Sequence, residues 1–234
     1  MNALRIEFLG DAALLLRLGD GIDAQINQRV HACASALCAQ TPSWLIDVTP
    51  AYACLALHVD VALIGGEDPL ASARAWLMQW LERTRFDPRD AEVRTIEIPV
   101  AYDDEYGPDL ATVAAHAGMA TEDVVAHHTS AIYSVAMLGF APGFPYLFGL
   151  DPALAMPRLT TPRTHVAAGS VGIGGAQTGI YPQSGPGGWR LIGRTPLRLF
   201  DAQRDPPSLL QAGDRVRFVA IDAATFAAMD EHAR

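Results

Sequence analysis

The side chains best suited to chemistry gather in one stretch, Leu138 to Asp201, which also holds 12 of the 20 glycines. Arg163 can clamp a carboxylate or a phosphate through two parallel hydrogen bonds, and Gln177 can pair with an amide as both donor and acceptor. His165 is the best acid or base candidate by its position. The N–H groups of residues 172–175 can form a nest for an anion. These side chains and N–H groups are the candidates for chemistry in this chain.

The same stretch is rich in glycine and proline but differs from a flexible linker, because large aromatic residues anchor it. We predict ordered loops between short strands, with the backbone close to a ligand. The residues expected to contact that ligand are Phe140, Pro142, Gly143, Phe144, Ser170, Gly174, Gly175, Tyr181 and Trp189. Structural roles are the alternative. The aromatic rings can be packing anchors, the glycines can serve backbone conformation, and Arg163, His165 and Gln177 can tie strands and loops together.

Composition excludes several classes of function. The formal net charge of -9 argues against nucleic acid as the main partner, because phosphate binding needs a basic face. All 17 positions counted as lysine or arginine are arginine, which excludes a Walker lysine and a Schiff-base lysine. Glycines 174 and 179 have the spacing of a phosphate loop, but Ile180 and Tyr181 stand where lysine and serine or threonine are required. Any phosphate must be bound by arginine, loop N–H groups or a metal.

Three other groups of residues do not predict a functional site. His127 and His128 are neighbours on an expected helix and would point about 100° apart, so no metal site is predicted. A nucleophile elbow is suggested by residues 168–172, but Ala168 replaces its first glycine. The cysteines at 33, 38 and 54 fit neither a disulfide framework nor a zinc site, and we expect reduced core thiols. No leader or bilayer-spanning run is evident, which predicts a cytoplasmic protein without a membrane partner.

Two domains are expected to position these residues. Residues 1–86 predict the order β-β-α-β-β-α, a small α/β domain with helices on a sheet. The expected strands are Leu4 to Phe8, Ala13 to Leu18, Trp44 to Val48 and Cys54 to Val59, and the helices are Ile22 to Ala39 and Asp68 to Thr84. The polar segment Phe86 to Asp90 carries a proline and is the expected linker.

Residues 87–234 begin with the alternating strand Val93 to Val100. Asp109 is expected to cap a short helix that ends at Gly118, and Thr121 to cap a second helix to about Thr129. Many short strands with glycine and proline punctuation then favour a barrel or a sandwich. They are Thr164 to Val166, Ser170 to Ile173, Gly188 to Gly193, Pro196 to Leu199 and Arg215 to Ile221, and a short helix is expected after Ala224.

Several long blocks stand in a fixed order. They read Gly139-Phe140-Ala141-Pro142-Gly143-Phe144-Pro145-Tyr146-Leu147, Pro162-Arg163-Thr164-His165-Val166 and Gln177-Thr178-Gly179-Ile180-Tyr181-Pro182, with further blocks at 168–173, 187–189 and 192–201 and weaker ones at 9–14 and 50–52. This set resembles the KipI/PxpB family, also called allophanate hydrolase subunit 1, which is related to one half of the carboxyltransferase domain of urea carboxylase. The resemblance covers nearly the whole chain.

The resemblance implies an α+β protein, with a small N-terminal α/β domain and a C-terminal cyclophilin-like β-barrel domain. It also implies the B subunit of a bacterial ATP-dependent 5-oxoprolinase, which converts 5-oxoproline to L-glutamate with two partners. These are the A and C subunits of that enzyme, the latter resembling allophanate hydrolase subunit 2. ATP with Mg²⁺ is implied for the complex, and its place on this chain stays open. The alternatives are a module that inhibits a sensor histidine kinase and a chain related to allophanate hydrolase or urea carboxylase.

Lactam opening is difficult because the amide is stabilised by resonance, and phosphorylation of its oxygen makes the ring carbon electrophilic. Such a site needs donors for the substrate carboxylate and the amide oxygen, a base that directs water, and positive partners for phosphate. In that chemistry Arg163 is the candidate clamp for carboxylate or phosphate, Gln177 is the candidate partner of the lactam amide, and His165 is the candidate acid or base.

Overall fold

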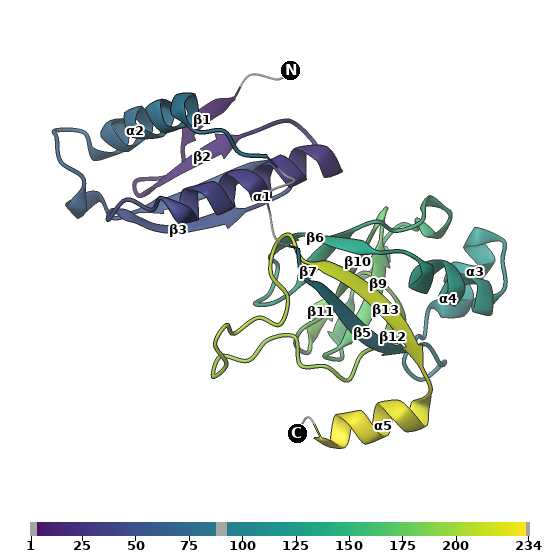
Figure 1. The fold of residues 1–234 in the computed structure, drawn as a ribbon. Coiled ribbons are helices and arrows are strands. Elements are labelled where there is room, and N and C mark those ends of the chain that lie inside the picture. Colours follow the sequence, from purple (N-terminus) through teal and green to yellow (C-terminus); the bar gives the residue numbers. More distant parts are fainter. Residues whose placement is uncertain (1–3, 88–92, 233–234) are drawn as a thin grey trace. The chain divides into compact units, whose positions relative to one another are not determined.

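A computed structural model describes residues 4–87 and 93–232 (Figure 1). The chain divides into two compact units, Met1–Glu92 and Val93–Arg234. Residues 88–90 of the expected linker lie outside the described ranges. The candidate chemistry lies entirely in the second unit.

The first unit is a four-stranded antiparallel sheet with the strand order β1-β2-β4-β3. Its strands are β1 (Arg5–Phe8), β2 (Ala13–Arg17), β3 (Leu45–Pro50) and β4 (Cys54–Val59), and its helices are α1 (Ala24–Ala39), the 3-10 helix Val61–Leu63 and α2 (Pro69–Arg83). Asp23 and Asp68 cap α1 and α2 by accepting the N–H of Ile26 and of Ala71. The element order predicted from the sequence is confirmed.

One face of this sheet carries the core of the first unit. Leu14 pairs with Leu57 and Leu16 with Leu55 across β2 and β4, and all four side chains are fully buried. Side chains of both long helices belong to the same cluster, among them Val30 and Leu37 of α1 and Leu77 of α2. Both helices therefore pack on one face, which explains the apolar stripes of their sequences (Figure 1).

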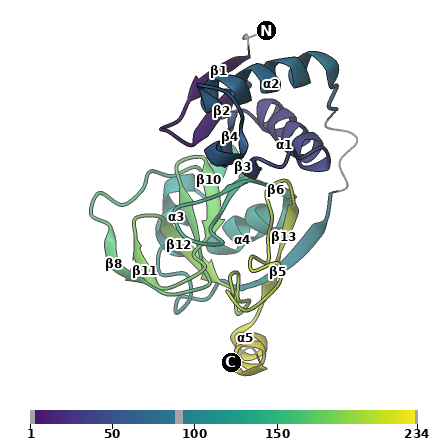
Figure 2. The ribbon, with the colours of Figure 1, turned by 90° about the vertical axis from the view of Figure 1, so that its left-hand side faces the viewer.

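The second unit is a closed barrel of seven strands in the order β10-β7-β6-β13-β5-β12-β9. The strands are β5 (Thr95–Ala101), β6 (Tyr133–Leu138), β7 (Pro145–Phe148), β9 (Ser170–Gly174), β10 (Gln177–Ile180), β12 (Arg190–Arg194) and β13 (Arg215–Ile221). Strands β5 and β13 run parallel, and the other paired neighbours are antiparallel. A separate two-stranded ribbon joins β8 (Arg163–Val166) to β11 (Gly185–Gly187), and Figure 2 shows these strands side by side. The predicted barrel is confirmed.

Helices α3 (Leu110–Ala117) and α4 (Thr121–Ser130) pack on the barrel, and α5 (Ala223–His232) follows its last strand. Gly118 ends α3 in the left-handed conformation at φ 67°, as predicted. Asp109 occupies the predicted cap position of α3 but does not cap it with its side chain, and the cap predicted at Thr121 is wrong. The Asp109 carboxylate makes no hydrogen bond to its helix, because its oxygens bind elsewhere, and Thr121 is the first residue of α4, with Ala120 at the cap position.

The predicted strand Pro196 to Leu199 is also wrong, since this segment has no ladder pairing. The hydroxyl oxygen of Thr195 accepts the N–H of Leu197 at 3.2 Å, which commits that N–H to a local turn. A short 3-10 helix, Pro152–Leu154, occurs between β7 and β8.

The cysteines are free thiols, as predicted, but only Cys33 is a buried core residue, while Cys54 is half-buried and Cys38 is exposed. Burial raises the pKa of the Cys33 thiol to about 12. Among the described residues, no helix combines the length and the apolar character that crossing a membrane requires.

Candidate functional site

The second unit contains an aromatic cavity of about 280 Å³. Its walls come from the β6–β7 loop, the ribbon β8–β11 and the segments that follow β10 and precede β12. The lining residues are Phe140, Phe144, Tyr146, Arg158, Leu159, Pro162, Tyr181, Pro186, Gly187, Gly188 and Trp189. We call this space the aromatic cavity. Its lining is mainly apolar and includes one cationic side chain.

The rings of the cavity hold one another edge to face. The ring centre of Phe144 lies 5.3 Å from that of Tyr181 and 5.5 Å from that of Trp189, with nearly perpendicular planes. Pairs in this geometry add about 0.5–1.5 kcal/mol beyond area burial. Phe144, Tyr181 and Trp189 are buried, so their shared contacts define rigid walls.

Phe140 forms the exposed rim of the cavity. Its side chain is 67% exposed, and its ring stacks edge to face on Phe144 and Tyr181. Its backbone has φ 70°, the only positive φ of a non-glycine residue in the described part of the chain. A bulky residue held in this region stores strain, and such strain collects at binding sites. The β6–β7 turn therefore holds a large apolar ring at the mouth.

Two glycines give the walls their space. A Cβ on Gly174 would lie 2.6 Å from the Trp189 ring, and a Cβ on Gly187 would lie 2.5 Å from the Tyr181 hydroxyl. Both distances are far below van der Waals contact, so a side chain at either position would displace a wall. Gly174 supports the cavity from behind Trp189 and is not in the lining.

Two arginines lie close to the apolar walls. The exposed Arg158 places its guanidinium carbon 5.5 Å from the Trp189 ring centre. Burial raises the pKa of the Tyr181 phenol, while Arg158 and Arg163 act in the opposite direction. Tyr181 is thus a neutral wall within the electrostatic reach of both arginines. The cavity suits a small ring that carries a negative group.

Arg163 begins β8, directly after the lining residue Pro162. Its Nη2 atom donates to Asp109 Oδ1 at 2.9 Å, and the other oxygen of Asp109 accepts the N–H of Leu191 at 2.7 Å. Asp109 is 6% exposed. The Nη1 atom of Arg163 is buried and has no hydrogen-bond partner within residues 4–87 and 93–232. Sequence reasoning missed Asp109, because its place before a helix predicted only a cap.

The structure brings together Phe140, Phe144, Tyr181 and Trp189 in the cavity, with Arg163 beside it. It places the other predicted residues elsewhere. His165 is exposed on β8, Gln177 begins β10, Ser170 is buried in β9, and Pro142 and Gly143 line a shallower depression beside Phe200. Their proposed contacts with a ligand stay predictions.

The predicted anion nest at residues 172–175 is not formed. Gly172 and Gly174 belong to β9, which pairs with β10 on one side and β12 on the other. The N–H groups of such a strand face its two neighbours. Gly175 has φ 65°, but its N–H donates to the Met156 carbonyl at 2.8 Å. Arginine side chains are thus the anion partners that this region offers.

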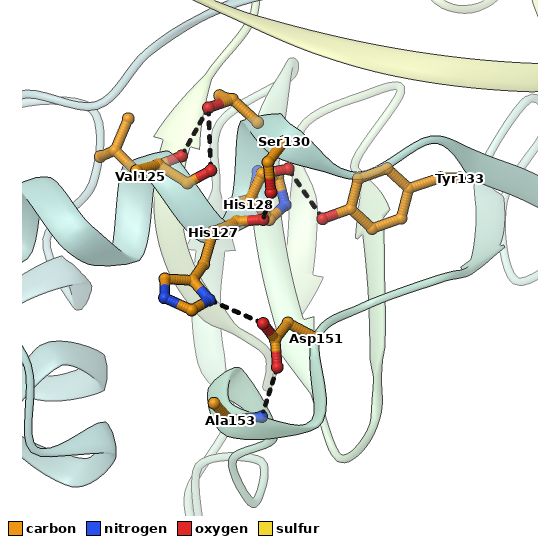
Figure 3. A network of polar contacts seen from close by, with 9 residues as sticks. Val125, His127, His128, Ser130, Tyr133, Asp151 and Ala153 are labelled. Carbon is orange, nitrogen blue, oxygen red and sulfur yellow. Dashed lines mark hydrogen bonds and ion pairs between the residues drawn. The ribbon is translucent and has the colours of Figure 1, made fainter.

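The neighbouring histidines of α4 have separate environments (Figure 3). His127 is exposed and its Nδ1 lies 2.6 Å from Asp151 Oδ2, while Asp151 also accepts the N–H of Ala153. These bonds, the one from Ala153 first, lower the pKa of the Asp151 carboxyl. His128 is buried, and its carbonyl accepts the Tyr133 hydroxyl at 2.8 Å. Within the described residues, no three His, Cys, Asp or Glu side chains converge as metal ligands.

Comparison with known proteins places the chain in a family. Residues 4–210 match the model described as carboxyltransferase domain, subdomain C and D. Two relatives named as the B subunit of 5-oxoprolinase are each 43% identical, one from Bacillus subtilis (strain 168) over 97% of both chains and one from Escherichia coli O157:H7 over 94% of this chain and 97% of its own.

A crystal structure of TTHA0988 is similar to 90% of this chain, with a TM-score of 0.78 and 39% identity. This chain spans 40% of the TTHA0988 chain. The match from residue 4 to residue 210 covers nearly all of the first unit, residues 93–210 of the second unit and every wall of the aromatic cavity. The chain therefore belongs to the carboxyltransferase subdomain C and D family and is similar over nearly its whole length to proteins named as the B subunit of 5-oxoprolinase.

Proposed function

We propose that this chain is the B subunit of an ATP-dependent 5-oxoprolinase and that its aromatic cavity receives 5-oxoproline. Two observations support the assignment. The relatives with 43% identity over nearly their whole length carry the name of that enzyme component. The cavity has an apolar interior with arginines beside it, which matches a small ring with one carboxylate.

The observation that carries the proposal is the lining of the cavity. Apolar walls that include Phe144, Tyr181 and Trp189 leave about 280 Å³, near the lower limit of ligand pockets in general. A five-membered lactam fits such a space. The faces of its ring pack on aromatic walls, and its carboxylate pairs with a guanidinium.

The same lining supports a requirement for partner chains. It contains neither a carboxylate nor a histidine, and the Tyr181 phenol has a raised pKa, so the cavity itself supplies no base for water. His165 is exposed on β8, within the ribbon that forms one wall, and we keep it as the proposed acid or base of a completed site. ATP, its Mg²⁺ and the remaining catalytic groups are assigned to the assembly with the A and C subunits.

The test is 5-oxoproline-dependent ATP hydrolysis by this chain mixed with its two proposed partners, with each component omitted in turn. Glutamate and ADP formed together only in the full mixture support the proposal. A Trp189→Leu variant should raise KM for 5-oxoproline, because it removes one aromatic wall. The mutation Phe8→Leu, at an exposed ring of the first unit, is the matched control and should leave KM unchanged.

Two other outcomes would redirect the assignment. A folded complex that hydrolyses no ATP with 5-oxoproline, yet turns over another cyclic amide or a urea derivative, would keep the lactam-type site and change the substrate. A complex without turnover, together with inhibition of a sensor histidine kinase by this chain alone, would favour the binding-module alternative.

A further inference from the structure

The Asp109 carboxylate stands at the start of α3 without capping it. Its Oδ2 atom accepts the N–H of Leu191 at 2.7 Å, and its own N–H donates to the Leu191 carbonyl at 2.9 Å. These two bonds fix the residue against β12. Its remaining oxygen, Oδ1, is directed at Nη2 of Arg163 at 2.9 Å. A buried carboxylate with two fixed partners is a rigid anchor for a guanidinium.

Only one of the two terminal nitrogens of Arg163, Nη2, is held by Asp109. Its side chain is 29% exposed, but the Nη1 atom is buried and lacks an acceptor within the described ranges 4–87 and 93–232. A buried donor without a partner is costly, because it gives up its hydrogen bonds to water. Native structures keep few such groups, and an acceptor that arrives with a ligand is one way to satisfy them.

Arg163, which carries the unsatisfied donor, is not itself in the lining of the aromatic cavity but is next to residues that are. Pro162, the residue before Arg163, lines the cavity, and Arg163 pairs across the ribbon with Gly187, which also lines it. The positive charge of Arg163 acts on the Tyr181 phenol, a third part of the wall. Strand register and the effect on Tyr181 thus both place Arg163 beside the cavity.

We propose that Asp109 is a positioning residue, which holds Arg163 so that its Nη1 atom receives the carboxylate of a small cyclic amide in the aromatic cavity. This inference rests on the proposed function and deepens it, since it names the group of the ligand that is recognised and the residue that recognises it. A carboxylate accepts hydrogen bonds only, so it satisfies Nη1 without adding a donor to the buried site.

Arg158 is the competing cation, and the structure distinguishes the two. Arg158 is exposed and stacks on Trp189, so water screens its charge and its donors are already solvated. Arg163 is oriented by a buried carboxylate and has a desolvated donor. An anion gains more from the second arrangement, because no solvation of the donor is lost on binding.

The experiment compares two ligands on the assembled complex by isothermal titration. One is 5-oxoproline and the other is 2-pyrrolidinone, the same lactam ring without the carboxylate. The variants are Arg163→Gln, Asp109→Asn and Arg158→Gln, the last of which tests the competing cation. Melting temperatures confirm folding. The double variant Asp109→Asn/Arg163→Gln removes both charges together, in case Arg163→Gln leaves the buried Asp109 charge uncompensated.

Arg163→Gln should weaken 5-oxoproline binding about 10- to 100-fold, the range of a charge-assisted hydrogen bond, and should leave 2-pyrrolidinone within about threefold. Asp109→Asn should lower the preference for 5-oxoproline over 2-pyrrolidinone by a smaller factor. It should also raise KM for 5-oxoproline and leave KM for ATP unchanged. Arg158→Gln should change the preference less than about threefold.

Equal losses for both ligands in the Arg163 and double variants would overturn the inference and leave the pair as a structural tie. A preference that disappears in Arg158→Gln would overturn it in favour of the exposed cation. In both cases a wild-type complex that still turns over 5-oxoproline keeps the proposed function. A wild-type complex that binds neither ligand would overturn both proposals.

Discussion

Tyr102 and His128 meet in the buried interior of the second unit, where the Tyr102 hydroxyl lies 2.8 Å from Nδ1 of His128. The other ring nitrogen, Nε2, lies 3.2 Å from the Thr178 hydroxyl, whose hydrogen is donated to the Gly172 carbonyl at 3.0 Å. The Thr178 oxygen can therefore only accept, so His128 carries its proton on Nε2 and accepts from Tyr102 at Nδ1. The network ties α4 to strands β9 and β10 through a neutral imidazole.

This network predicts how stability depends on pH. Burial lowers the pKa of His128 from 6.5 to about 3 in the folded protein. Between these values the unfolded chain binds a proton that the folded chain does not, so stability falls as pH falls from about 6.5 toward 3. The expected slope is about 1.4 kcal/mol per pH unit for this group. Urea unfolding at pH 4, 5, 6 and 7 measures it.

The control for this prediction is the adjacent histidine. His128→Gln removes the titrating group and should flatten the decline between pH 6 and pH 4 relative to wild type. His127→Gln changes an exposed ring paired with Asp151 and should keep the decline. Equal slopes for wild type and His128→Gln would show that other groups cause the acid sensitivity.

Gly174→Ala should damage both stability and ligand binding. Its new methyl group would lie 2.6 Å from the Trp189 ring. Gly174 belongs to a strand that is paired on both sides, so the backbone is fixed and the indole must move. We expect a loss of about 1–3 kcal/mol in the free energy of unfolding and a higher KM for 5-oxoproline. Thermal unfolding and steady-state kinetics measure these effects.

Gly185→Ala is the matched substitution for this test. Gly185 lies in β11, where a Cβ would meet no atom within 4 Å and the φ is not positive. Its free energy of unfolding should stay within about 0.5 kcal/mol of wild type. If both variants lose stability equally, the space behind Trp189 is not the cause.

Phe140→Gly should stabilise the chain relative to Phe140→Ala. Both variants remove the exposed ring, but only glycine adopts φ 70° without a Cβ penalty. The difference should be about 1 kcal/mol in favour of glycine, measured by denaturant unfolding. Both variants should raise KM for 5-oxoproline, because the cavity loses its rim. A glycine variant no more stable than the alanine variant would show that the loop relaxes without strain.

Asp109→Ala should be among the most destabilising single changes in the barrel unit. It leaves the guanidinium of Arg163 without its buried partner and removes the acceptor of the Leu191 N–H. Breaking a buried pair on one side costs about 3–5 kcal/mol. Glu97→Ala removes the exposed partner of Arg217 in the same barrel and should cost less than about 1 kcal/mol. Similar losses in the two variants would contradict the buried pair as an anchor.

The elements of regular periodicity were predictable because their signal is local. Strand β13 occupies the predicted residues Arg215–Ile221, and α1 and α2 follow their apolar stripes to within about two residues. The family and the barrel were predictable as well, since long blocks such as residues 139–147 keep their order along the chain. The strand predicted at Pro196 to Leu199 shows the limit of such local signals. The hydrogen bond that the Thr195 hydroxyl accepts from the Leu197 N–H outweighed the strand-like composition of the segment.

The site was only partly predictable, and the reason is distance along the chain. The sequence by itself determined the family, the barrel and the aromatic and arginine residues of one stretch, because each rests on local pattern or on residue type. Tertiary structure decided which of them meet. Asp109 is bound to Leu191, 82 residues away, and to Arg163, 54 residues away, and no local pattern reports such pairs. Closure of the barrel also paired β9 on both sides, which turned an expected nest of glycine N–H groups into part of the sheet.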